Sequence, residues 1–159
     1  MIKKIILSLT FILLIFTGCA TVTPTGGAFT DSVVETSKSR LIIFRGGGSL
    51  LAKEIPAVNI FGAQPSIYNL PSNSFIQEDL VPGEYEIIVS KDSNNPGLVW
   101  RFEPIGIKIN LIQNKTTYLE LEANTNLLIY TADITEVDKA YALSNLNSLN
   151  RVLFTDTAN

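Results

Sequence analysis

The chain has 159 residues with 12 Lys and Arg against 15 Asp and Glu, no histidine, and a single cysteine, Cys19. The missing histidine excludes imidazole general bases, His-containing triads and His-ligated metals. One cysteine excludes an intramolecular disulfide and a thiolate zinc site, and the acidic balance lacks the basic footprint of nucleic-acid binding. We therefore expect no cofactor, no metal and no nucleic-acid partner.

Residues 1–18 have the pattern of a signal peptide. Two lysines precede an apolar run over residues 5–16, which has the length of a signal h-region, whereas a membrane-spanning helix needs about 20 residues. The run leads into Phe16-Thr17-Gly18-Cys19, which resembles a bacterial lipobox. The resemblance implies cleavage between Gly18 and Cys19 and acylation of Cys19. The alternative is an ordinary secretory signal that is cut elsewhere, with an incidental cysteine.

An acyl anchor would place the protein in the cell envelope. Each buried methylene contributes about 0.8 kcal/mol, and two or more chains, such as palmitate groups, give stable attachment. Ala20 rather than Asp follows the cysteine. By analogy with the sorting of bacterial lipoproteins, this implies an outer membrane location facing the periplasm where the source has two membranes.

Residues 19–39 read as a lipidated N-terminus followed by a flexible tether. The stretch is dominated by Thr, Ser and Gly and has no apolar periodicity. Val33 and Val34 are its one apolar pair, for which we expect at most a short strand at the domain edge. The folded domain is expected over residues 40–153, followed by a disordered tail over 154–159.

Short β-branched and aromatic runs alternate with turn residues through most of this domain. The runs are 40–45, 57–61, 66–70, 74–78, 98–102, 105–112, 116–122 and 127–132. The apolar residues of 40–45 are continuous, which indicates a strand that is covered on both faces. The pattern predicts a mostly β protein, a single antiparallel β-sandwich of about seven strands.

Pro82-Gly83 is the clearest local signal. Proline presets φ for the first central position of a turn and glycine accepts a positive φ at the second, so we expect a type II turn. Tyr85, Ile87 and Val89 then alternate with Glu84, Glu86 and Ile88, which predicts that the first three form the core-facing side of the following strand.

A short C-terminal helix is expected after the last strand. Thr135 is a suitable N-cap, and Glu136 adds negative charge in the first turn, where the helix dipole favours it. Tyr141 and Leu143 are among the side chains expected to cover the sheet. The Asn-rich stretch 145–150 lowers the helix propensity.

Several of these features together resemble a family of small bacterial lipoproteins of unknown function with a transthyretin-like or PEGA-like β-sandwich. They are the lipobox, the strand ending in Phe44-Arg45, the strand opening Pro56-Ala57-Val58 and the turn Val81-Pro82-Gly83-Glu84-Tyr85. The resemblance covers roughly residues 40–146. It implies a fold and an envelope location, and it transfers no catalytic residue.

Three groups of residues are candidates for chemistry. The glycines 46–48 with Ser49 and Lys53 lack the spacing of a phosphate loop. Paired carboxylates about 5 to 10 Å apart in a cleft would suit glycan cleavage, and an aromatic platform would suit a ligand. The carboxylate candidates are Glu84, Glu86, Glu120 and Glu122, and the aromatic candidates are Tyr68, Trp100 and Tyr130. Exposed strand faces and core packing explain both sets more simply.

The sequence therefore favours a non-enzymatic envelope lipoprotein. Its membrane partner would be reached through the N-terminal lipid, and its sandwich would bind an envelope protein or a cell-wall component by a strand edge or by loops. The alternatives are a carboxylate-based hydrolase of cell-wall glycan and an acidic inhibitor of a cationic wall-degrading enzyme. The last rests on the mature net charge of −5, since ten basic residues remain without Lys3 and Lys4 against 15 acidic ones.

Overall fold

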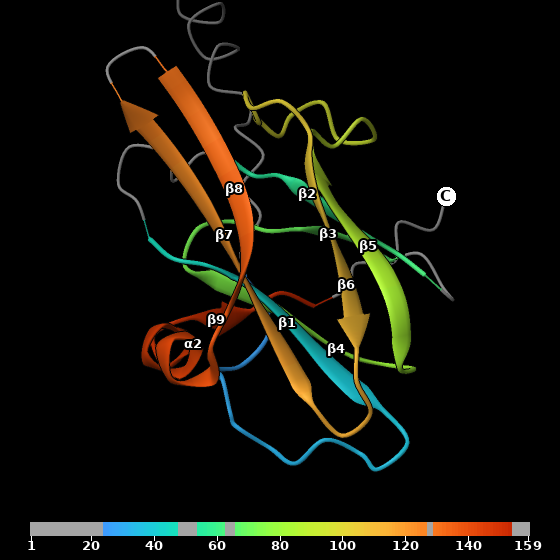
Figure 1. Cartoon of the computed structure of the whole chain (residues 1–159). Helices are drawn as coiled ribbons and strands as arrows, with labels where there is room; N and C mark the ends of the chain where they lie inside the picture. Colours follow the sequence, from blue (N-terminus) through green and yellow to red (C-terminus); the bar gives the residue numbers. More distant parts are fainter. Residues whose placement is uncertain (1–23, 48–53, 63–65, 127–128, 154–159) are drawn as a thin grey trace, which may run out of the picture.

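Two β-sheets pack face to face in the computed structural model, which describes residues 24–47, 54–62, 66–126 and 129–153 (Figure 1). The five-stranded sheet, in the order β8-β7-β1-β4-β9, contains β1 (Ser39–Arg45), β4 (Ser74–Leu80), β7 (Thr116–Asn126), β8 (Ile129–Val137) and β9 (Asn150–Arg151). The four-stranded sheet, in the order β3-β2-β5-β6, contains β2 (Ala57–Phe61), β3 (Ser66–Asn69), β5 (Gly83–Ser90) and β6 (Ile105–Leu111). The helix α2 (Lys139–Leu146) completes the described elements.

The prediction of a mostly β sandwich is confirmed, but two of its details are wrong. The described residues form nine strands rather than about seven, because β9 arises in the Asn-rich stretch after the helix. The pairings β1–β7 and β4–β9 are parallel, so the sandwich is not wholly antiparallel. Parallel pairing is possible here because each partner strand is reached through a long excursion of the chain, not through a hairpin.

The main core lies between the two sheets and follows the predicted alternation. Tyr85, Ile87 and Val89 are buried as expected, and they face inward-pointing residues of β1, β4 and β7 in one cluster. β1 lies in the middle of its sheet, and every residue of it is buried, as its continuous apolar run predicted. The apolar residues of β1 lie on both of its faces, so a second layer outside the five-stranded sheet is required.

That second layer is formed by α2 and the chain segment before β1. The cluster on this outer face consists of Ile42, Phe44, Phe75, Tyr118, Ala142, Leu146 and Leu149, with Phe29 and Val137 packed against it. The helix begins later than expected, because Thr135 and Glu136 still pair with β7 as part of β8. Asp138 is the N-cap, and its Oδ1 accepts a hydrogen bond from the Tyr141 N–H at 2.9 Å.

Two short connections of the chain cross from one sheet to the other. β4 and β5 belong to different sheets, as do β6 and β7. Gly83 has a φ of +151°, in the range that favours glycine, but not the value near +80° of a type II turn. The type II assignment is therefore wrong, because Gly83 is already the first residue of β5 and pairs with Leu111.

Residues 98–102 form no strand, although every second side chain of the segment is buried. Leu98, Trp100 and Phe102 are buried, and the backbone makes one isolated bridge between Val99 and Glu54. The partner segment runs into Pro56, which has no N–H for a ladder, so pairing stops there. The last expected strand, 127–132, is shifted to β8.

The segment expected to be a flexible tether contacts the domain throughout its described part. We call residues 24–38 the N-terminal strap. Gly26 N–H donates to the Arg151 carbonyl at 2.9 Å, and the Phe29 ring meets Phe75 edge-on at 5.7 Å. The tether prediction is therefore wrong for the strap. Composition does not show that the Phe29 ring packs against the domain, or that the backbone of Gly26 and Gly27 forms hydrogen bonds with it. Val33, which is 96% exposed, and Val34 form no strand.

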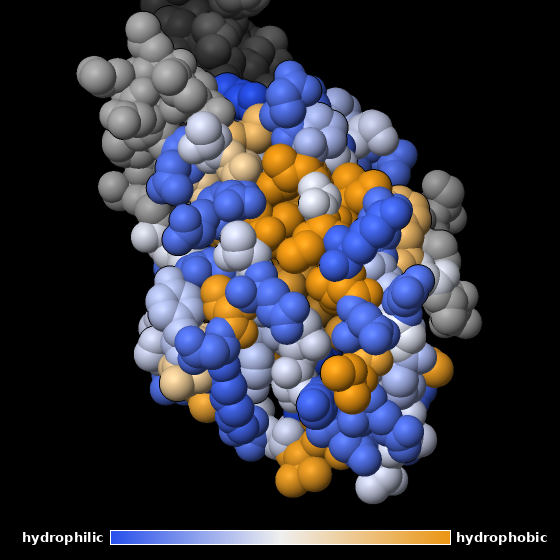
Figure 2. Space-filling view, in the orientation of Figure 1, coloured by the Kyte–Doolittle hydropathy of each residue, from blue (hydrophilic) through white to orange (hydrophobic). Residues whose placement is uncertain are grey.

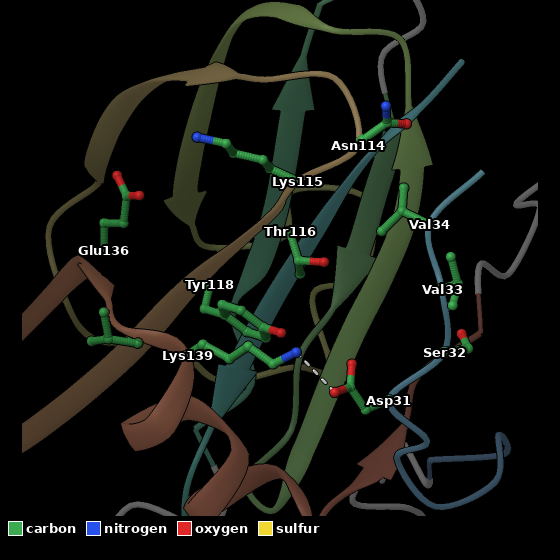
Figure 3. A pocket seen from close by; sticks show the side chains of 11 residues that line it. Asp31, Ser32, Val33, Val34, Asn114, Lys115, Thr116, Tyr118, Glu136 and Lys139 are labelled. Atoms are coloured by element: carbon green, nitrogen blue, oxygen red, sulfur yellow. Dashed lines mark ion pairs between the residues drawn. The ribbon is translucent and has the colours of Figure 1, made fainter. Parts of the chain in front are cut away.

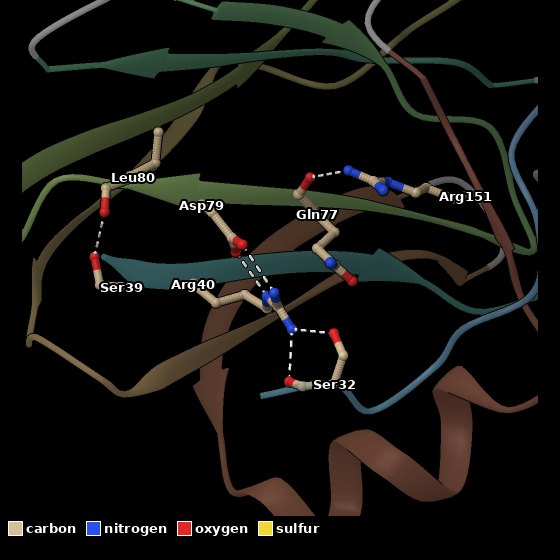
Figure 4. A network of polar contacts seen from close by, with 7 residues as sticks. All are labelled: Ser32, Ser39, Arg40, Gln77, Asp79, Leu80 and Arg151. Carbon is tan, nitrogen blue, oxygen red and sulfur yellow. Dashed lines mark hydrogen bonds and ion pairs between the residues drawn. The ribbon is translucent and has the colours of Figure 1, made fainter. Parts of the chain in front are cut away.

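A buried arginine ties the strap to the five-stranded sheet (Figure 4). Arg40 Nε donates to Asp79 Oδ1 at 2.6 Å and its Nη2 to Oδ2 at 2.8 Å. The third guanidinium nitrogen donates to both the carbonyl and the hydroxyl of Ser32 at 2.8 Å. One planar side chain therefore holds β1, β4 and the strap together.

Candidate functional site

The four candidate glutamates do not converge on one site. Glu84 and Glu86 point outward from the four-stranded sheet, and Glu120 and Glu122 point outward from the five-stranded sheet. Two packed sheets are about 10 Å apart, so carboxylates on opposite outer faces are farther apart than that. Each pair is therefore a separate surface feature.

The pair on β7 has the more unusual surroundings. Glu120 and Glu122 line an open pocket of about 200 Å³ beside Gly46 and Gly47. Partial burial and the neighbouring Glu122 raise the pKa of Glu120, while a hydrogen bond from the Tyr141 hydroxyl at 3.2 Å acts in the opposite direction. Alternate residues of a strand lie about 7 Å apart, within the range of paired catalytic carboxyls.

The aromatic candidates that the structure describes belong to the core. Tyr68 and Trp100 are both 4% exposed, so neither offers a platform to a ligand. The side chain of Tyr130 lies outside the described residues. Tyr68 donates its hydroxyl to Glu78.

Trp100 belongs instead to a buried charged cluster at one end of the sandwich. Arg45 lies over its ring with 5.7 Å between the guanidinium carbon and the ring centroid, and donates to the Glu54 and Leu70 carbonyls. Burial lowers the pKa of Arg45 to about 10, which keeps it charged at neutral pH. The Glu54 carboxylate, 1% exposed, accepts from both Nε and N–H of Arg101, at 2.6 and 3.1 Å. The cluster contains no nucleophile, and we assign it a structural role.

A mixed-charge pocket of about 470 Å³ lies where the strap meets β7 and α2 (Figure 3). Lys139 Nζ forms an ion pair with Asp31 Oδ2 at 2.9 Å, and the Tyr118 ring forms the floor beside them. This carboxylate raises the pKa of Lys139. A lysine that is held charged is neither a nucleophile nor a base at neutral pH. The pocket therefore has no means of covalent catalysis through this lysine.

An apolar surface lies between the edges of the two sheets. Figure 2 shows it as an orange area between β8 and β6. We call the part-exposed inward-facing residues Ile105, Ile107, Ala123 and Ala132 the lateral strip. Ala123 and Ala132 are direct cross-strand partners, so two small side chains face the isoleucines of β6. The outer edges of β6 and β8 have no strand partner in the part of the chain that the structure describes.

The sequence favours binding by a strand edge or by loops, and it does not indicate which edge is exposed. Alternation along a run indicates which face of a strand is buried. It does not indicate whether the strand lies at an edge, because this depends on the order of strands in the sheet. The alanine pair was the one available signal, because small residues at core-facing positions leave space that larger neighbours do not fill.

Several predicted site residues lie outside the described residues, namely Gly18 and Cys19 of the cleavage site and Ser49 and Lys53 of the glycine-rich segment. Within the described residues no group of three or more Asp, Glu or Cys side chains is arranged to hold a metal ion. No helix among them has the length and apolarity to cross a membrane. The chain matches no family model, no curated protein and no solved structure.

Proposed function

We propose that the protein is a lipid-anchored envelope protein whose sandwich binds an extended segment of a partner protein by strand addition at the lateral strip. The observation that carries this proposal is that two strand edges flank part-exposed core side chains. Membership of the transthyretin-like or PEGA-like lipoproteins, and periplasmic exposure at an outer membrane, belong to the same proposal. The lipobox-like residues Phe16-Thr17-Gly18-Cys19 support the anchoring half of it.

Strand addition uses both features of the lateral strip. A new strand at the β8 edge would satisfy backbone groups with main-chain hydrogen bonds, and its alternate side chains would cover the strip. β8 offers nine residues for pairing, whereas β3 offers four and β9 only two. Long exposed edges promote association unless they are protected, so β8 is the edge that most needs a partner.

The charge around β8 indicates the chemistry of that partner. Asp133 is exposed on the outward face of this strand, Glu122 of β7 is its direct cross-strand partner, and β8 carries no basic residue. Opposite charges placed across paired strands are stabilising. The occupant is therefore an extended segment in which apolar residues alternate with basic ones.

The test is a fluorescent peptide of alternating valine and lysine, titrated into the purified domain and followed by anisotropy. Ala132→Leu fills the strip and should weaken binding about tenfold, a loss of about 1.4 kcal/mol. Thr131→Leu, the matched control on the other face of the same strand, should bind like the wild type.

Two further outcomes would contradict strand addition. A peptide with proline at its centre, which cannot pair along its length, should not bind. Equal binding of this peptide, or full binding by Ala132→Leu, would show that the edge is not the site. Thermal unfolding of both variants checks that the fold is retained.

A carboxylate-based glycan hydrolase is the second candidate, favoured by the raised pKa of Glu120 beside Glu122. A carboxyl that stays protonated at higher pH suits a general acid, and its neighbour would serve as the second carboxyl. Hydrolysis of cell-wall glycan that disappears in Glu120→Gln and persists in Glu84→Gln would establish this function. Absence of hydrolysis in the wild type would exclude it.

A further inference from the structure

One margin of the sandwich differs in charge from the rest of the chain. We call residues 24–28, 71–75 and 147–153 the β9 margin. Hydrogen bonds join the three segments: Gly26 N–H to the Arg151 carbonyl at 2.9 Å, Asn150 N–H to the Asn73 carbonyl at 3.3 Å, and Val152 N–H to the Phe75 carbonyl at 2.7 Å. The margin contains no Asp or Glu and one basic residue, Arg151, whereas the other residues from 19 onward contain nine basic and 15 acidic ones.

The margin is also the part of the domain closest along the chain to the proposed anchor. Gly26 is seven residues after Cys19, and a chain spans at most about 3.6 Å per residue, so Cys19 lies within about 25 Å of Gly26. The strap contacts shorten the free connection to this length. A tether extending to residue 39 would have allowed a much larger distance.

The lateral strip lies on the opposite side of the domain. In the five-stranded sheet, β9 and β8 are the two outermost strands. Four inter-strand spacings of about 4.8 Å place them about 19 Å apart. An anchor at one edge therefore leaves the other edge farther from the bilayer.

We propose that the β9 margin is a bilayer-facing surface that approaches lipid headgroups, so that the lateral strip points away from the membrane. The inference rests on the lipid anchor of the proposed function. Anionic headgroups repel acidic surfaces and attract basic groups near them. The three segments of the margin contain no carboxylate, and their one charged side chain is Arg151, whose guanidinium donates to the Gln77 carbonyl at 2.7 Å. The margin is therefore the side of an acidic domain that anionic headgroups repel least.

The experiment uses the full acylated protein, checked by intact mass, in vesicles that carry a quencher on the lipid headgroup. The single native cysteine is occupied by lipid, so an introduced cysteine is the only free thiol for a fluorophore. Asn150→Cys labels the β9 margin and Thr131→Cys labels exposed β8 on the far side. Quenching at residue 150 should exceed that at residue 131 at least about threefold, given the short connection.

Two variants separate the effect of the short connection from the effect of charge: the first lengthens the connection and the second adds a carboxylate to the β9 margin. A Gly/Ser spacer of about 20 residues inserted after Ala20 should make the two labels equally quenched. Asn147→Glu should reduce quenching at residue 150 in anionic vesicles and leave it unchanged in zwitterionic ones.

Three results would overturn the inference. Equal quenching of the two labels in the acylated protein without a spacer would show that the domain has no fixed orientation, and stronger quenching at residue 131 would show that the orientation is reversed. Either result would leave the anchor itself intact. Protein without acyl mass would reject the anchor, and with it the bilayer-facing surface.

Discussion

At the scale of single residues, the least tolerant positions are charges that the fold removes from water. Glu54 is almost fully buried, its carboxylate oxygens accept hydrogen bonds from Nε and the backbone N–H of Arg101, and Arg45 contributes a favourable charge nearby. A buried carboxylate is costly unless its partners are in place. The cluster therefore has a structural role in the domain and not a catalytic one.

Arg101→Ala should destabilise the domain by about 3 kcal/mol, because it removes the guanidinium and leaves the Glu54 carboxylate buried with less compensation. Urea unfolding followed by the fluorescence of Trp100 measures this change. Lys91→Ala, which removes an exposed charge, is the control and should be neutral. A loss below about 1 kcal/mol would show that water reaches Glu54.

The Arg40–Asp79 pair predicts a dependence of stability on pH. The hydrogen bond from Arg40 lowers the pKa of the Asp79 carboxyl below its ordinary value. The folded state thus binds this proton more weakly than the unfolded chain does. The contribution of the pair is complete above the unfolded pKa, near 3.8, and is lost as the pH falls through the lower folded value.

Asp79→Asn should therefore lower the unfolding free energy by about 1 kcal/mol near neutral pH, a partly exposed pair being worth no more than that. The difference from the wild type should stay constant down to about pH 5 and shrink below about pH 4. Thermal unfolding across this range gives the curve. A difference that grows in acid would mean that another group dominates.

At the scale of elements, the strap converts an exposed sheet face into a second core. Its one large apolar residue, Phe29, packs against Phe75 beside the cluster that α2 covers. The same segment adds two backbone hydrogen bonds to Arg151, so these backbone groups of the short strand β9 are paired. Composition predicted a tether here because Thr, Ser and Gly dominate the stretch and its apolar residues show no periodicity.

Phe29→Ala should destabilise the domain by about 2 kcal/mol, since a part-buried aromatic ring is lost. Hydrogen exchange should then accelerate at the amide of Arg151, which donates to the Gly27 carbonyl. Val33→Ala alters a residue that is 96% exposed and should change neither quantity. Unchanged protection of Arg151 would show that the backbone bonds hold the strap without the ring.

At the scale of the whole molecule, the proposed anchor determines where the domain works. Cys19→Ser should leave uncleaved precursor and move the protein out of the stable membrane-bound form, because the acyl chains supply the binding energy. Fractionation and intact mass of the wild type and variant measure this. Tight association of a processed, unacylated variant would place the attachment elsewhere in the chain.

Local patterns predicted much of the fold because they depend on neighbouring residues only. The continuous run of β1 indicated burial on both faces, and the alternation in β5 indicated one buried side. Both follow from side-chain periodicity along a strand, which the sequence contains directly. The signal peptide and lipobox expected over residues 1–19 are predictions of the same kind, because they are inferred from residue order and length alone.

Strand order, sheet membership and the strap depended on contacts between residues far apart in the chain. No local pattern separates a turn within one sheet from a crossing between two, which is why Gly83 was assigned to the wrong turn type. The lateral strip exists because β6 and β8 end up as edges of different sheets with Ala123 and Ala132 beside the gap. The sequence by itself determined which strand positions are apolar, because that pattern is local. The tertiary structure decided which of these apolar side chains stay partly exposed, because exposure depends on which strands form the edges of the sheets.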